Sequence, residues 1–390
     1  MAEAYIAAVA RSAGGKRGGR LAAVHPADLA GKILAALVER SGIDPAAVED
    51  VVMGCACPGG EQGANIARNA VLASGLPQSV PGTHVDRQCG SSQQALHFAA
   101  ATVMSGVQDV VIAAGVESMT RVPMGLPWTL PAKHGFGTYR SPGIEARYPN
   151  QPFSQFGGAE MLAKKYGLPR DVLDAYALES HRRAAAATEA GKFDAEIVPL
   201  EIVTPEGETV IHKVDEGIRF DATLERIASV KLLNEDGVIS AANASQICDG
   251  AAALLVVNEA GLKAHGLIPL ARIHQMTVLG HDPVIMLEAP IPATEKALAR
   301  AGMRLSDIDL YEVNEAFAPV PLAWAGALGA DPDRLNVHGG AISLGHPLGG
   351  SGAKLMATLV SALHDRGARY GLQTMCEAGG MANVTIVERL

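Results

Sequence analysis

The sequence has few aromatic residues, no surplus of positive charge and no long apolar run, and each shortage excludes a class of protein. Aromatic residues make up 4 % of the 390 residues while 43 residues are glycine, which predicts a core of small aliphatic side chains and tight turns. The net charge of −9 argues against non-specific nucleic-acid binding, because affinity for phosphate needs an excess of Lys and Arg. A polyanionic small ligand remains compatible with a local basic patch or a helix N-terminus.

Segments that direct a chain to a membrane are also lacking. The start, MAEAYIAAVARSAGG, has no apolar core of signal-peptide length, and no apolar run reaches the roughly 18 residues of a membrane helix. The chain ends in ERL rather than in the peroxisomal SKL. Its five cysteines, an odd number, show neither CxxC nor zinc-ligand spacing, which predicts a reducing compartment and no metal site. We therefore expect a cytoplasmic protein with no membrane partner.

The apolar patterns that are present predict an α/β protein. With 48 % hydrophobic and 19 % charged residues, the chain is long enough for two or three units or one large α/β body. Residues 27–40 have the 3.6-residue period of an amphipathic helix, and 109–115 and 251–257 are continuous apolar runs typical of buried strands. Such alternation favours a mostly parallel sheet covered by helices.

A weak internal repeat divides the chain into two similar halves. GIDPAAVEDVVMG (42–54) matches GMRLSDIDLYEVN (302–314) in pattern, and each segment runs from a helix into a strand. Residues 122–158 are rich in Pro and Gly, which is typical of a lid or binding loop. We therefore expect a first half of residues 1–118 and 246–265, an inserted loop domain of residues 119–245, and a second half of residues 266–390.

Cys89 is the first candidate nucleophile. It follows a strand-like HVDRQ, and the GSSQQA after it opens a predicted helix. The positive end of a helix dipole and its free N–H groups are expected to lower the pKa of a thiol. The alternative is a buried, inert cysteine, which is common. We interpret Cys55 and Cys57 in that ordinary way, as core residues and not zinc ligands.

Three further candidates stand at turns or strand ends. His346 lies in the glycine-rich GGAISLGHPLGGSG, where a fixed imidazole is suited to act as general base for a thiol. Cys376 ends a predicted strand before a glycine turn, a place from which a thiol can carry a proton. Asn314, in VNEAFAPV, is placed to hold a water molecule or to cap a helix. Taken singly, each has an ordinary structural alternative.

Taken together, these segments resemble the thiolase family, the acyl-CoA:acetyl-CoA C-acyltransferases. CGSSQQA, NEAFA, GGAISLGHPLGGSGA and TMCEAGG occur in this order, and the resemblance runs from HPADLAGKIL through NASQICDGAAALL to the C-terminus. It implies the thiolase fold, in which two similar α/β halves form a layered α/β/α/β/α body with an inserted loop domain. It also implies an enzyme that cleaves 3-oxoacyl-CoA with CoA to acetyl-CoA and a shortened acyl-CoA.

The resemblance implies a role for each candidate. Cys89 would form an acyl-enzyme after activation by His346, and Cys376 would protonate the acetyl-CoA enolate and then deprotonate CoA. His346 and a water held by Asn314 would stabilise the enolate oxygen. Backbone N–H groups of Cys89 and Ala378 would form the second oxyanion site.

Coenzyme A is expected as a substrate, with no permanently bound cofactor. Ser245 in NASQ matches a family serine that contacts pantetheine, and Arg219 in GIRFDATLE matches an arginine near the adenine. The ordinary alternatives are a turn residue for Ser245 and a solvated charge for Arg219. Since the family is dimeric or tetrameric, we expect a homodimer or homotetramer.

Three departures from the family pattern bear on the substrate. Ala378 stands at the first glycine of Cys-x-Gly-Gly-Gly, so its N–H stays usable if no positive φ is needed. Glu377 fills a position that is commonly apolar. Gln155-Phe156-Gly157 stands where short-chain biosynthetic members carry His-Met-Gly, which favours a degradative enzyme of fatty acid or steroid side-chain β-oxidation. The ending CEAGGMANVTIVERL also resembles thiolases that shorten steroid side chains.

Three other functions compete with this hypothesis. A short-chain acetoacetyl-CoA thiolase would use the same residues on a smaller substrate. A ketoacyl synthase generally uses Cys-His-His, and Cys376 at the third position argues against it. A non-catalytic acyl-CoA or lipid-binding protein of the same fold would usually lack one or more of the reactive residues.

Overall fold

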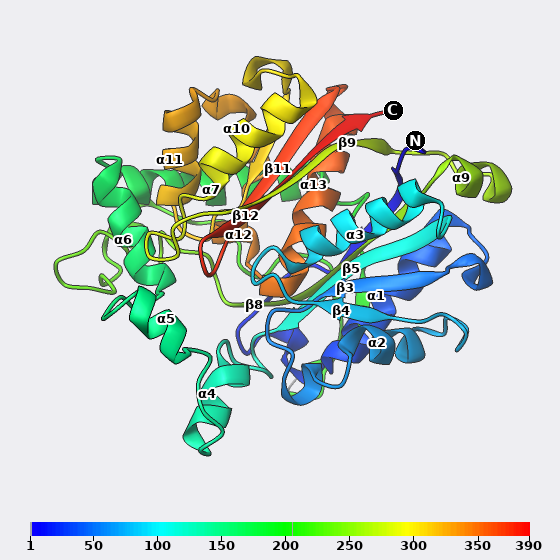
Figure 1. Ribbon diagram of the computed structural model, residues 1–390, viewed down its shortest axis with the longest axis horizontal. Coiled ribbons are helices and arrows are strands. Elements are labelled where there is room, and N and C mark those ends of the chain that lie inside the picture. The colour runs from blue at the N-terminus through cyan, green and yellow to red at the C-terminus, as the bar shows by residue number, and fades with distance from the viewer. Residues whose placement is uncertain (1, 205) are drawn as a thin grey trace.

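The architecture is given by a computed structural model that describes residues 2–204 and 206–390 (Figure 1). The strands are β1 (Tyr5–Arg11), β2 (Gly15–Lys16), β3 (Asp50–Gly54), β4 (Thr83–Val85), β5 (Val110–Ser118), β6 (Leu200–Val203), β7 (Thr209–His212), β8 (Cys248–Val257), β9 (Ala271–Gly280), β10 (Leu310–Val313), β11 (Tyr370–Glu377) and β12 (Met381–Arg389). The helices are α1 (Pro26–Ser41), α2 (Ile66–Ser74), α3 (Ser91–Ser105), α4 (Leu126–Lys133), α5 (Pro142–Arg147), α6 (Gln155–Lys165), α7 (Arg170–Glu189), α8 (Leu224–Ala228), α9 (Glu259–His265), α10 (Pro290–Ala301), α11 (Pro319–Leu328), α12 (Ala341–Leu344) and α13 (Ser351–Arg366).

One large sheet runs through both halves of the molecule. Its strands follow the order β10-β11-β12-β9-β1-β8-β5-β3-β4, with β2 paired to β8 beside this path. Parallel pairing joins β3 to β4, β3 to β5, and β10 to β11, whereas the other neighbouring pairs are antiparallel. The expectation of a mostly parallel sheet is therefore wrong. A continuous apolar run shows that both faces of a strand are buried, which holds for β5 and β8, but it carries no information on strand direction.

The two halves repeat the same elements, which confirms the predicted doubled α/β class. In the first, α1 leads through a short 3-10 helix at Pro45–Ala47 into β3, and in the second, α10 leads through one at Leu305–Asp307 into β10. The pair α3 and β5 likewise corresponds to α13 and β11. The helix predicted at 27–40 forms as α1, and the apolar run 109–115 lies in β5 but for its first residue.

Helices form three layers around the two parts of the sheet. Apolar residues of α1 and α2 pack on one outer face with β3, β5 and β8, and those of α10 and α11 pack on the other with β10 and β12. Between them, α3 and α13 share a core cluster with strands from both halves. The central layer therefore brings the N-terminal ends of α3 and α13, which follow the two candidate motifs, into one region.

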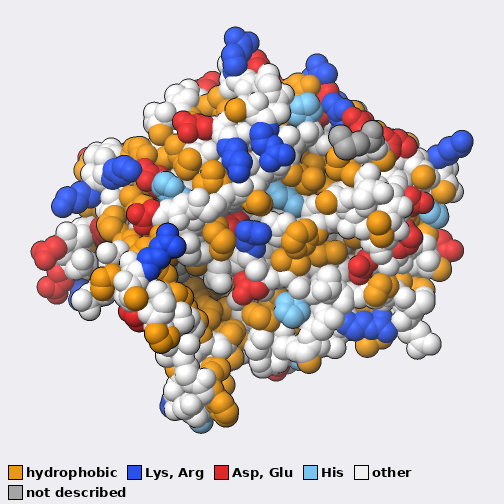
Figure 2. Space-filling model, in the orientation of Figure 1, with side chains coloured by type: hydrophobic (Ala, Val, Ile, Leu, Met, Phe, Trp, Pro, Cys, Tyr) orange, Lys and Arg blue, Asp and Glu red, His pale blue; other side chains and the backbone are white. Residues whose placement is uncertain are grey.

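The segment after β5 is more ordered than its composition predicted. Instead of one irregular stretch over 122–158, it contains α4 and α5, which form an arm projecting from the body (Figure 1). Figure 2 shows hydrophobic side chains on this arm and on the adjoining part of the body. Large apolar side chains exposed on the arm are those of Met124, Leu130, Phe136 and Tyr139. Within the described part of the chain, no helix is both long and apolar enough to cross a membrane.

Close backbone contact holds the two candidate loops together. A Cβ atom on Gly349 would lie 2.5 Å from the Cys55 Cα atom, and one on Gly54 would overlap the Ser92 backbone nitrogen. Glycine at these positions thus lets the turn after His346 and the start of α3 pack directly on the end of β3. This packing fixes the relative position of the two segments.

Candidate active site

Cys89 lies at the entry to α3, on a tight turn. The preceding residue, Gln88, has a φ of 52°, a left-handed conformation that is uncommon for a residue with a side chain. The Ser91 N–H donates to the Gln88 carbonyl at 3.1 Å and closes the turn. The Cys89 side chain, 7 % exposed, faces an apolar cluster that includes Met119 and Leu348. The turn therefore places the thiol against this apolar cluster.

The pKa of Cys89 is raised, contrary to the expectation for a thiol at a helix N-terminus. Burial is the main cause, and the neighbouring Cys376 and Glu377 raise it further. The desolvation of a buried thiolate costs more free energy than the helix end contributes, because the dipole stabilises an anion by only about 0.3–1 kcal/mol in most settings. Cys89 is therefore a neutral thiol in the resting protein and needs a base.

His346 is a neutral imidazole in a defined tautomer. Burial lowers its pKa to about 3, with a smaller contribution from the Lys354 charge. Its Nδ1 atom lies 2.5 Å from the Ser351 hydroxyl, and that hydroxyl donates its own hydrogen to the Pro347 carbonyl at 3.0 Å. Ser351 must therefore accept from His346 Nδ1–H, which leaves the lone pair on Nε2. Nε2 is the atom that can take a proton.

Asn314 lies beside that nitrogen. Its Nδ2 atom is 3.4 Å from His346 Nε2, and its backbone N–H donates to the Thr374 carbonyl at 3.0 Å. The Oδ1 atom is buried and has no hydrogen-bond partner among the described residues. A buried amide oxygen without a partner is suited to hold a water molecule.

Cys376 is the second buried thiol. It is 1 % exposed near the end of β11, and burial raises its pKa to about 12. Ala378, two residues on, does not take a positive φ, whereas Gly379 and Gly380 do, with φ of 82° and 72°. The replacement of glycine by alanine at 378 therefore causes no backbone strain.

These residues converge from distant parts of the chain. His346 contacts Asn314, and Cys376 acts on the pKa of Cys89. The flanking residues Leu348 and Met375 share the apolar cluster of Cys89. Four of the predicted residues therefore lie in one buried region at the junction of the two halves.

Two supporting residues escaped the sequence analysis. Ser351 orients His346, as described. Glu117, at the end of β5, accepts hydrogen bonds from the backbone N–H groups of Ala56 at 2.8 Å and Gly349 at 2.8 Å. A charged residue closing the apolar run of β5 was the available signal for Glu117, but nothing in the sequence indicated its partners.

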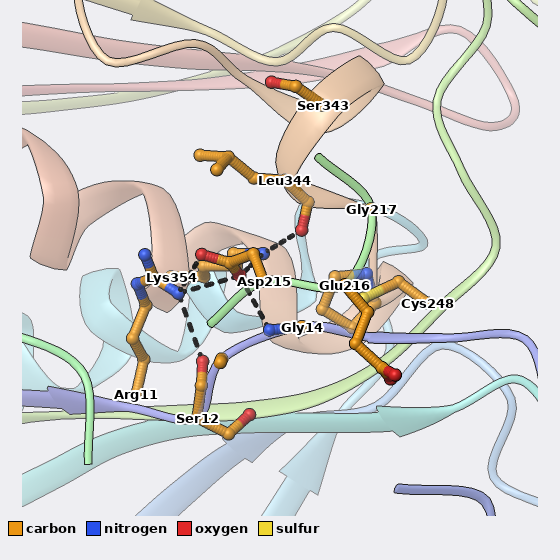
Figure 3. A network of polar contacts seen from close by, with 12 residues as sticks. Arg11, Ser12, Gly14, Asp215, Glu216, Gly217, Cys248, Ser343, Leu344 and Lys354 are labelled. Carbon is orange, nitrogen blue, oxygen red and sulfur yellow. Dashed lines mark hydrogen bonds and ion pairs between the residues drawn. The ribbon is translucent and has the colours of Figure 1, made fainter. Parts of the chain in front are cut away.

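A buried charge network holds the chain just before His346 (Figure 3). Lys354 Nζ donates to the Leu344 carbonyl at 2.5 Å and to Asp215 at 3.2 Å. Asp215 also accepts from Arg11 Nη1 at 3.0 Å and from the Gly14 N–H at 2.6 Å. Burial opposes the ionisation of Asp215, yet the Arg11 and Lys354 charges outweigh it and lower its pKa. The network ties the segment around Asp215 to the loop that carries His346.

A cavity of about 350 Å³ lies next to this loop. Arg219, Arg226, His181 and Gln246 line it together with Ile342 of α12. The two arginines supply positive charge in an otherwise acidic protein. Ser245 is half-buried and directly precedes Gln246, but it is not itself among the residues that line the cavity.

Comparisons with known proteins point to one family. The family model of the thiolase N-terminal domain matches residues 4–260, and that of the C-terminal domain matches residues 267–389. A steroid 3-ketoacyl-CoA thiolase of Mycobacterium tuberculosis is 50 % identical over 395 residues, covering 100 % of this chain and 95 % of that protein. A 3-ketoacyl-CoA thiolase of Psychrobacter arcticus is 42 % identical over 385 residues, covering 97 % and 96 %. The crystal structure of a Bacillus anthracis acetyl-CoA acetyltransferase covers 100 % of this chain and 99 % of its own, with a TM-score of 0.91 and 37 % identity.

Proposed function

Because the chain belongs to the thiolase family, we propose that it cleaves 3-oxoacyl-CoA with CoA through an acyl-enzyme on Cys89. The products are acetyl-CoA and an acyl-CoA shortened by two carbons, so the protein is an acyltransferase. The observation that carries the assignment is the convergence of Cys89, His346 and Cys376 in one buried region, with His346 Nε2 unprotonated. A binding protein would have no need of two buried thiols beside a free base.

The first step forms the acyl-enzyme. His346 Nε2 takes the Cys89 proton as the sulfur attacks the 3-keto carbon of the substrate. Because the resting thiol and imidazole are both neutral, charge separates only when the substrate is in place. Backbone N–H groups of Cys89 and Ala378 serve the tetrahedral oxyanion, and losing one such donor typically costs roughly 3–4 kcal/mol in the barrier.

Carbon–carbon cleavage then releases the acetyl-CoA enolate. Its electron pair comes from the broken C2–C3 bond and takes the proton of Cys376. The raised pKa of Cys376 keeps that proton available at neutral pH. A water held by the unpartnered Asn314 Oδ1 atom and the charged His346 stabilise the enolate oxygen.

The second half-reaction returns the enzyme to its resting state. The Cys376 thiolate takes the proton of incoming CoA, and the CoA thiolate attacks the thioester on Cys89. The Cys89 sulfur leaves and recovers its proton from His346, so all protons are returned. CoA is thus a substrate, and the scheme uses no bound cofactor.

A degradative role on a bulky acyl group fits the chain best. The relatives named as 3-ketoacyl-CoA thiolases include the steroid enzyme at 50 % identity. Phe156, at the short-chain His-Met-Gly position, packs edge-on against Phe317 with ring centroids 5.6 Å apart. The side chains packed around Cys89, among them Met119, Val122 and Met375, are apolar, which suits a site for an apolar acyl group. A homodimer or homotetramer is part of the proposal, since the arm exposes large apolar side chains.

Thiolysis across a substrate series tests the proposal. We expect kcat/KM to be at least about tenfold higher for steroid-linked or long-chain 3-oxoacyl-CoA than for acetoacetyl-CoA, because a larger apolar group adds binding energy. A preference for acetoacetyl-CoA would instead support the short-chain alternative, which agrees with the relatives named acetyl-CoA acetyltransferase. CoA binding without any turnover would favour the non-catalytic alternative.

Arg219 is proposed to bind the phosphate-bearing end of CoA. We expect Arg219→Ala to raise the KM for CoA by about fivefold with little change in kcat, because an exposed ion pair contributes about 1 kcal/mol at most. Initial rates at varied CoA concentration measure this. The exposed Arg304→Ala is the control, and an unchanged KM in Arg219→Ala would contradict the assignment.

Ser351 is proposed to position the base. Ser351→Ala removes the acceptor that fixes the His346 tautomer, so we expect kcat to fall by about tenfold or more while KM changes little. Ser361→Ala, on the same helix α13, is the matched control. Equal kcat values in the two variants would remove this role.

A further inference from the structure

Glu377 is a buried carboxyl group next to both cysteines, and the proposed reaction does not use it. It ends β11 directly after Cys376, and its exposure is 0 %. A Cβ atom on Gly90 would overlap Glu377 Oε1 and lie 2.7 Å from its Cδ atom. The carboxyl group therefore lies against the residue that follows Cys89.

The surroundings of this carboxyl group favour its neutral form. Neither of its oxygens has a hydrogen-bond partner in residues 2–204 and 206–390, and burial raises its pKa to about 8. Arg87 lowers that pKa in part, yet the two side chains form no ion pair within the same residues, and the Arg87 Nε atom is itself buried without a partner. An ionised carboxylate here would lose its hydration without compensation.

Glu377 and Cys89 meet at the same end of α3. This helix has 15 residues, and its N-cap, Gly90, supplies no side-chain cap. The helix end therefore favours whichever anion forms beside it. A Cys89 thiolate and a Glu377 carboxylate would be two negative charges at one place, and each would oppose the other.

We propose that Glu377 controls the ionisation of Cys89 through its own charge. While Glu377 is protonated, the Cys89 thiolate is free to form, and once Glu377 is ionised, its negative charge opposes that thiolate. The inference rests on the proposed function, since it takes Cys89 as the nucleophile. Glu377 touches no reacting atom, and it acts through the charge that it places beside Cys89. The consequence is an alkaline limit on acylation that is set by a carboxyl group.

The other ionisable groups here differ from Glu377 in their charge or in their hydrogen-bond partners. Arg87, in the segment before α3, is a positive charge that lowers the pKa of Glu377, and burial raises the pKa of Cys376 to about 12. Glu117, on β5, also raises the pKa of Cys89. Burial raises the pKa of Glu117 as well, but Glu117 differs from Glu377 in accepting hydrogen bonds from backbone N–H groups, which oppose that rise. The facing part of β12 carries the uncharged Met381 and Asn383.

Alkylation of Cys89 by iodoacetamide, located by peptide mass spectrometry, tests the proposal without any turnover. Glu377→Gln keeps the shape of the neutral acid and cannot ionise. We expect wild type and Glu377→Gln to react equally at about pH 6.5 and the variant to react about tenfold faster at about pH 9, a one-unit pKa effect. Glu312→Gln is the matched control, because Glu312 is a buried carboxyl group on the neighbouring β10 whose pKa burial also raises.

Three outcomes are distinguishable. The proposal is overturned if the Cys89 alkylation rate of Glu377→Gln, divided by that of wild type, is the same at both pH values. Labelling of another cysteine in place of Cys89 overturns the proposed function itself. The wild-type protein alone provides a test that does not depend on folding of a variant. Its alkylation rate should rise less steeply above about pH 8 than below it, and a uniform slope overturns the inference.

Discussion

Replacing Cys89 with alanine is expected to abolish thiolysis, lowering kcat/KM by about 10⁴-fold or more. Without the sulfur no acyl-enzyme forms, and the reaction loses the intermediate that divides it into two steps. His346 and the oxyanion donors remain, so substrate binding should survive. Thiolysis rates and intact-protein mass spectrometry after incubation with acyl-CoA measure the two effects.

The control for this variant replaces another cysteine, one that is as buried as Cys89 but lies elsewhere in the fold. Cys248 is 2 % exposed, and burial raises its pKa to about 12. We expect Cys248→Ala to retain the acyl adduct and most of the turnover. If Cys89→Ala still gained the mass of the acyl group, the nucleophile would be another residue.

The position of the site was predictable because its motifs are local. The apolar period at 27–40 predicted α1, observed at Pro26–Ser41, and the GSSQQA after Cys89 predicted α3, which begins at Ser91. Such signals depend only on residues close in the chain. The roles of Cys89, His346, Cys376 and Asn314 remain predictions that the variants must test.

Properties that depend on distant residues were not predictable. The direction of the strands follows from the path of the chain between them, so the apolar runs alone gave the wrong sheet. The pKa of Cys89 was expected to fall because the sequence reveals the helix end but not the burial, which dominates. The space that holds the Glu377 carboxyl group likewise depends on Gly90, which lies far away in the sequence.

A common electrostatic property unites the site. Cys89 and Cys376 are thiols with raised pKa values, His346 is neutral, and Glu377 holds a proton at neutral pH. The resting site therefore carries little charge and admits an apolar acyl group at low desolvation cost. Charge appears only during the reaction, where the surrounding dipoles act most strongly on it.

The Cys376→Ala variant is expected to separate the two parts of the reaction. Thiolysis of 3-oxoacyl-CoA should fall by about 10³-fold, within the range expected for loss of a general acid. The enolate of a thioester is strongly basic and leaves only if it is protonated. By contrast, a CoA thiolate has the ordinary stability of a thiolate, with a parent pKa of about 8.5, and leaves without an acid.

The same variant should therefore still accept an acyl group from a simple acyl-CoA. Intact-protein mass spectrometry would then show an adduct on Cys376→Ala and none on Cys89→Ala. Unchanged thiolysis in Cys376→Ala would remove its role as proton carrier. Loss of the adduct as well would mean that Cys376 acts on the reactivity of Cys89 itself, since Cys376 raises the pKa of Cys89. Only the combination of a retained adduct and lost thiolysis assigns the enolate proton to Cys376.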